Sequence, residues 1–175
     1  MGIKPFPRPG ISWSAMRKIL EQENICNSLN GRIQYFQTRY KKAHDQPGRV
    51  AIRLDGKEIF QCDNSKFGEK YGEAWYNIQE NNIEGDSLME RHKKAMLSAI
   101  SQVGAYSFYD SFYEYRNNSI CKSLTSPNAM VRLFAILDKR VGKRRLEKLV
   151  HEVKNQPEWL QIFFKLRFEA EKIVY

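Results

Sequence analysis

Residues 31–62 carry the one clear β-type pattern in this chain, and that pattern limits which folds the chain can adopt. Apolar and polar residues alternate there in three short runs, which is typical of strands that bury one face. The runs are 33–40, 50–54 and 59–62. Asp55-Gly56 favours a tight hairpin turn, because a type I′ turn needs φ > 0 at both central positions. We therefore expect an antiparallel meander of three strands over residues 31–62.

Most of the remaining sequence shows apolar residues at helical spacing. A three-stranded sheet alone is marginally stable, so helices are expected to cover its Val50-Ile52-Leu54 face. The predicted fold class is α+β: an N-terminal helix, the three-stranded antiparallel meander, and a mostly helical C-terminal part of about six helices. The expected helix signals are Ser14 to Asn30-Gly31, Ser87 with Glu90, Ser107 with Asp110, Ser126-Pro127, and Asn155 with Glu158.

The length of 175 residues and the hydrophobic content of 42% suit one domain with a single core. We interpret residues 1–175 as a single α+β domain. Residues 1–11 contain three prolines and are expected to form an extended leader, and residues 126–175 form the C-terminal helices. In those helices, five apolar residues are predicted to share one core. They are Leu133, Phe134, Leu137, Trp159 and Phe163.

The positive charge is concentrated in two segments of the chain. The net charge is +9, of which residues 31–62 contribute seven Lys/Arg against three Asp/Glu, and residues 126–175 eleven against six. A basic surface favours anionic partners. We therefore expect a non-enzymatic binding protein that contacts nucleic acid or an acidic protein partner.

The densest basic cluster is Lys139-Arg140-Val141-Gly142-Lys143-Arg144-Arg145. Cations at the start of a helix oppose its dipole, which an ordinary solvated charge run does not explain. The anion-binding residues predicted from this cluster are Arg140, Lys143, Arg144 and Arg145. A DNA-binding helix-turn-helix is not expected, because Asp138 and Lys148 would occupy its buried positions.

The meander carries a second basic surface that includes an aromatic residue. Arg32, Tyr35, Arg39 and Arg53 could form a face on which single-stranded bases stack. The alternative is that the aromatic residue packs inward and the cations protect the sheet edges.

One alternative function is enzymatic. His44, Asp45 and Arg49 lie at the turn between the first two predicted strands, and a His–Asp pair can act as an acid and its orienting group. The alternative is therefore an enzyme, such as a hydrolase, with its site at this turn. Asp at a turn also bonds its own backbone, so the pair alone is a weak signal.

The sequence points to no cofactor and no metal, and it contains no glycine-rich phosphate loop or nucleophile elbow. Cys26, Cys62 and Cys121 are odd in number and widely spaced, which predicts free thiols in a reduced, cytoplasmic setting. No stretch is apolar enough to span a bilayer, so no membrane association is expected.

Three blocks of the sequence resemble those of a known family. They are GRIQYFQTRYKKAHDQPGRVAIRLDGKEI, LFAILDKRVGKRRL and PEWLQIFFKLRFEAEKI, and Trp13-Ser14 is similar as well. The chain resembles an uncharacterised family of small bacterial cytosolic proteins. That resemblance implies a bacterial, single-domain, intracellular protein and transfers no chemistry.

Overall fold

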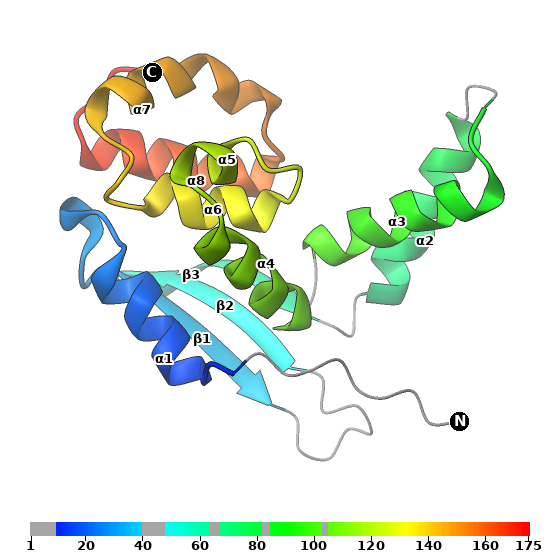
Figure 1. The fold of residues 1–175 in the computed structure, drawn as a ribbon, viewed down its shortest axis with the longest axis horizontal. Helices are drawn as coiled ribbons and strands as arrows, with labels where there is room; N and C mark the ends of the chain where they lie inside the picture. Colours follow the sequence, from blue (N-terminus) through cyan, green and yellow to red (C-terminus); the bar gives the residue numbers. More distant parts are fainter. Residues whose placement is uncertain (1–9, 40–47, 64–66, 82–84, 103–104) are drawn as a thin grey trace.

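The computed structural model describes residues 10–39, 48–63, 67–81, 85–102 and 105–175, and these form an α+β fold (Figure 1). A short helical segment precedes the sheet, and helices follow it. The elements before and within the sheet are α1 (Trp13–Lys18), η1 (Ile19–Glu23), η2 (Asn27–Leu29), β1 (Ile33–Arg39), β2 (Gly48–Leu54) and β3 (Lys57–Asp63). Those after it are α2 (Phe67–Glu80), α3 (Leu88–Gln102), α4 (Ala105–Asn117), α5 (Ile120–Leu124), α6 (Ala129–Leu137), α7 (Lys143–Leu149), η4 (Val150–Asn155) and α8 (Glu158–Ala170).

The sheet confirms the predicted meander. Its order is β1-β2-β3 with antiparallel neighbours, and Tyr35 lies opposite Ile52. At the turn after β2, Asp55 has φ 51° and Gly56 φ 84°, as a type I′ turn requires. Of the predicted leader, residues 1–9 lie outside the described part of the chain.

An irregularity in the pairing of β2 with β3 puts Glu58 and Phe60, two residues apart on β3, on opposite faces of the sheet. Ile52 pairs with Phe60, whereas the next residue, Arg53, pairs with Glu58. The extra residue on β3 is a β-bulge, and a bulge shifts the alternation of side chains between faces. Glu58 therefore bonds to arginines on the outer face, while Phe60 packs against Trp159 and its ring centroid lies 4.7 Å away.

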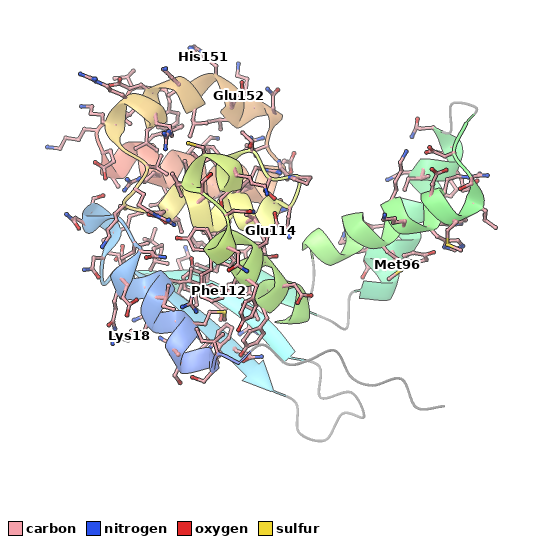
Figure 2. The ribbon with its side chains drawn as sticks, in the orientation of Figure 1. Lys18, Met96, Phe112, Glu114, His151 and Glu152 are labelled. Carbon is pink, nitrogen blue, oxygen red and sulfur yellow. The ribbon has the colours of Figure 1, made fainter. Side chains whose placement is uncertain are left out.

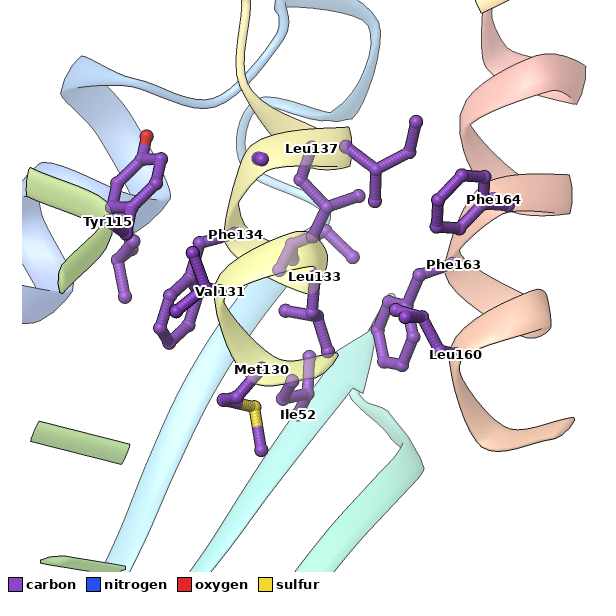
Figure 3. Close-up of a cluster of buried hydrophobic side chains, with 14 of the residues drawn as sticks. Ile52, Tyr115, Met130, Val131, Leu133, Phe134, Leu137, Leu160, Phe163 and Phe164 are labelled. Atoms are coloured by element: carbon purple, nitrogen blue, oxygen red, sulfur yellow. The ribbon is translucent and has the colours of Figure 1, made fainter. Parts of the chain in front are cut away.

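Helix α6 is the centre of the core (Figure 3). Phe134 lies on the side of α6 that faces Tyr115, and Leu133 and Leu137 lie beside Phe163 and neighbouring residues of α8. Eight of the nine residues of α6 are buried, so this helix has core on nearly every side. The predicted shared core of the C-terminal helices is confirmed, with Trp159 partly buried at its edge.

The first helix is shorter than the sequence predicted. Ser12, rather than Ser14, caps α1, and the helical segment ends at Glu23 as a π-helical turn instead of continuing to Gly31. The chain leaves the helix because its backbone bonds elsewhere: the Asn24 carbonyl accepts from the Lys139 amide at 2.7 Å. Tertiary pairing thus overrides local helix propensity.

Three later helix starts also differ from expectation. Helix α6 begins at Ala129 with Asn128 as its cap. The Ser126 hydroxyl donates to Glu114 at 2.5 Å and accepts from the Asn128 amide, which precedes the helix. Helix α8 follows Pro157 without any side-chain cap, and Asn155 donates to Glu152. Helix α4 already includes residues 105 and 106, so the predicted cap at Ser107 is wrong.

Helices α2 and α3 form a hairpin that projects away from the rest of the molecule (Figure 1). The predicted capping box is confirmed, since the Ser87 amide donates to Glu90 and the Glu90 amide donates to Ser87. Helix α3 nevertheless exposes large apolar side chains, among them Met89 and Met96. Within the described ranges, no helix is long and apolar enough to cross a membrane.

Candidate functional site

A set of cations surrounds the turn between α6 and α7. We name it the basic turn surface and define it as Lys139, Lys143, Arg144 and Arg145. Lys139, Lys143 and Arg144 are exposed, and Arg145 is partly buried. None of the four forms an ion pair with any residue that the structure describes. Gly142 is the residue before α7, so three cations stand in the first turn of the helix, where no acidic residue accompanies them.

Arg140 was predicted to belong to this surface, but the structure commits its guanidinium to a buried carboxylate. Its Nε donates to Asp138 Oδ2 at 2.9 Å and its Nη2 to the same oxygen at 2.6 Å. The Arg140 backbone amide donates to the other carboxylate oxygen at 2.7 Å. The hydrogen bond that Arg140 donates to Asp138 raises the pKa of Arg140 above its usual range. Arg140 is therefore chiefly a structural cation.

The expectation that Asp138 is unsuited to burial is wrong, because its charge is fully compensated. Its side chain has no exposed area, and besides Arg140 it accepts from the Tyr115 hydroxyl. Asn24 Nδ2 in turn donates to the Tyr115 oxygen at 3.0 Å. Burial raises the pKa of Tyr115, so the phenol keeps the proton that it donates. The gap beside this network has no room for a water molecule, so it is a packed interior.

The backbone of the turn between α6 and α7 is held by hydrogen bonds to two other parts of the chain. On one side, the Cys26 amide donates to the Leu137 carbonyl at 2.9 Å, and Asn24 accepts from Lys139. On the other, Nη2 of the buried Arg167 donates to the Val141 carbonyl at 3.0 Å. The exposed cations thus project from a framework that needs little ordering before it binds a ligand.

The second predicted surface does not form as the sequence suggested. Tyr35 is 1% exposed and packs against Phe134, so it cannot stack on a base at the surface. Arg32 pairs with Asp55 at the hairpin turn, at 2.7 Å. The side chain of Arg39 lies outside the described part of the structure. The alternative interpretation, in which the aromatic residue packs inward, is confirmed for Tyr35.

The outer face of the sheet presents a different aromatic residue. The Arg53 guanidinium lies over the ring of the exposed Phe36, 4.3 Å from its centroid. Arg49 and Arg53 both bond to Glu58, and the hydrogen bond from Arg49 is the main reason that the pKa of Glu58 falls to about 2. Because side chains alternate between the two faces along β1, the sequence already placed Phe36 on the face opposite to Tyr35. That alternation was the signal from which the exposure of Phe36 could have been predicted. On this face, two arginines thus share one glutamate.

The family of the chain follows from comparison with known sequences. The sequence model of the SF0329 protein family matches residues 12–168. The chain belongs to the SF0329 protein family. The resemblance to an uncharacterised family is thereby confirmed, and both the sheet and the basic turn surface lie within the matched residues. Comparison with curated proteins and with solved structures finds no significant match.

Membership of the SF0329 family brings no site residues with it, so the remaining candidates rest on the structure alone. His44 and Asp45 lie outside the described residues, while Arg49 is engaged with Glu58. In the described part of the chain, no group of three or more His, Cys, Asp or Glu residues is placed to hold a metal ion. Cys26 and Cys121 are free thiols, as predicted.

Proposed function

We propose that this SF0329-family protein binds nucleic acid without catalysis, through the basic turn surface. The observation that carries the proposal is the row of cations at the start of α7. Lys143, Arg144 and Arg145 oppose the helix dipole there and have no acidic partner among the described residues. Such an arrangement costs stability in the free protein, and a bound anion would offset that cost.

Repeating phosphates suit this surface better than a single small anion does. Arginine presents a fork of N–H donors that matches phosphate geometry, and lysine adds a mobile point charge. The turn between α6 and α7 is held by a backbone bond to Asn24 and by Arg167, so the backbone positions from which the cations project are fixed. The net charge of +9 adds long-range attraction to any polyanion.

The test is a salt titration of binding to labelled duplex DNA and to single-stranded RNA. Binding is expected to weaken steeply with salt, with a log–log slope of about −0.9 per phosphate neutralised on duplex DNA. A Lys143→Ala/Arg144→Ala variant should reduce the magnitude of that slope by about one or two and lower the affinity. Both side chains are exposed, so stability should change little.

The matched control is Lys154→Ala/Lys165→Ala, which removes the same charge from exposed positions elsewhere on the C-terminal helices. This control should reduce the magnitude of the salt-dependence slope less than Lys143→Ala/Arg144→Ala does. Equal effects of the two variants would mean that net charge, not this surface, governs binding. If the wild type binds neither nucleic acid at low salt, the proposal fails, and an acidic protein becomes the partner class to test.

The enzymatic alternative built on His44, Asp45 and Arg49 stays a hypothesis. Two of its three residues lie outside the described part of the structure, and no geometry supports it.

A further inference from the structure

The α2–α3 hairpin exposes an unusual amount of apolar surface. Its two helices pack on each other and lie apart from the body that contains the sheet (Figure 1). Four large hydrophobic side chains of the hairpin are nonetheless exposed: Tyr76, Leu88, Met89 and Met96. Met89 is 78% exposed, and Met96 lies on the projecting hairpin in Figure 2. A pair of helices with so little buried surface gains stability only when another surface covers it.

On α3, the exposed apolar residues form a stripe with one cation. Met89, Lys93 and Met96 are spaced i, i+4 and i+7, so they share one face of the helix. Lys93 is exposed and forms no ion pair with any described residue. Methionine is an adaptable packing residue that is common at interaction surfaces.

Helix α2 carries an exposed stripe with the same spacing, and the charged residues of this stripe are negative. Glu69, Glu73 and Tyr76 are again spaced i, i+4 and i+7. Glu69 forms no hydrogen bond or ion pair with a described residue, although its charge acts on Lys70, and Glu73 contacts Lys70 at 2.7 Å. Counting Asp, Glu, Lys and Arg, α2 carries one cation and three anions, whereas α3 carries three cations and one anion. The net charges of −2 and +2 are therefore complementary.

We infer that this hairpin is a dimerisation surface, and that its occupant is the hairpin of a second copy of the chain. The α3 stripe of one copy packs on the α2 stripe of the other. A two-fold axis parallel to the helices sets α3 of each copy against α2 of the other, and the two helices run antiparallel. With the stripes read in opposite directions, Lys93 then lies opposite Glu73 and Met89 lies opposite Tyr76. This interface is independent of the proposed nucleic-acid binding.

The charges also favour the pairing of α3 with α2 over the pairing of the two α3 helices with each other. If the two α3 stripes faced each other across a two-fold axis, Lys93 of one copy would lie against Lys93 of the other, and like charges repel. Pairing α3 with α2 replaces that repulsion with attraction, and it does so twice per dimer. Tyrosine and methionine are both enriched in protein interfaces.

The test measures molecular mass in solution as a function of protein concentration, by sedimentation equilibrium or light scattering. The wild type should reach twice the monomer mass at micromolar concentrations. Lys93→Glu should raise the dimer dissociation constant about tenfold or more, since it places like charges at both contacts. Adding Glu73→Lys to that variant should restore the dimer, because the opposite charges are then exchanged.

A second pair of variants tests the apolar part of the stripe. Met89→Lys should weaken the dimer because it places a charge against Tyr76, whereas Ile162→Lys, which alters an exposed apolar residue on α8, should leave the dimer unchanged. A wild type that stays monomeric throughout would overturn the inference and point to a different protein or to the body of the same chain as the cover. Failure of Glu73→Lys to rescue Lys93→Glu would overturn the pairing of α3 with α2.

Discussion

The Asp138–Arg140 pair links the exposed turn to the interior. Asp138 has no exposed side-chain area, while the Arg140 side chain is 46% exposed. Arg140→Ala should therefore lower the free energy of unfolding by about 2 kcal/mol, because a buried carboxylate loses its cation, though water can partly replace the half-exposed guanidinium. Urea unfolding followed by circular dichroism measures this loss.

A double-mutant cycle separates that effect from lost packing. In an Asp138→Asn background no buried charge remains, so the same Arg140→Ala change should cost clearly less. If Arg140→Ala costs the same in both backgrounds, the pair contributes no coupling and Arg140 acts through packing alone.

The lowered pKa of Glu58 predicts how the stability of the protein changes at acidic pH. The hydrogen bond from Arg49 is the largest cause that lowers its pKa to about 2, against a usual value near 4.5. A lowered folded-state pKa contributes stability above the unfolded-state value, and that contribution is lost as pH falls from 4.5 to about 2. The difference in urea midpoint between wild type and Glu58→Gln should thus be full at pH 6 and shrink through this window. A difference that does not vary with pH would contradict the assignment.

Among the elements, α6 contributes most to the core. Its one aromatic residue, Phe134, packs against several other aromatic rings of the core. Its centroid lies 5.0 Å from Phe108 and 5.7 Å from Tyr115. Phe134→Ala should lower the free energy of unfolding by about 3–5 kcal/mol, because it leaves a cavity among rings that cannot collapse onto it. Ile162→Ala on the exposed face of α8 is the control and should cost less than about 1 kcal/mol. Similar costs for the two variants would contradict the central place of Phe134.

The elements that periodicity specifies were predictable from the sequence, and the elements that tertiary bonds specify were not. The meander follows from alternation and from Asp55-Gly56, which act locally. The first helix ends early because Asn24 bonds to Lys139, more than a hundred residues away, and no local signal reports that bond. Ser126 looked like the cap of α6, but its oxygen accepts from the Asn128 amide, and Asn128 itself caps the helix.

At the scale of the whole molecule, the body and the projecting hairpin carry different surfaces. The body carries the basic turn surface, and the hairpin carries the complementary stripes on α2 and α3. The exposure of Lys143 and Arg144 could be predicted, since cations at a helix start need a solvent-facing or ligand-facing role. The bonding of Arg140 to Asp138 could not be predicted, because it depends on the burial of Asp138 beside Tyr115.

Amide hydrogen exchange in the presence and absence of nucleic acid tests the central claim most directly, because it locates the bound surface. With a short DNA duplex at low salt, protection should concentrate at residues 138–149, around the basic turn surface. The outer strand β3 and the α2–α3 hairpin should exchange as they do in the free protein. Protection centred on the sheet or on the hairpin, with none at 138–149, would contradict the account.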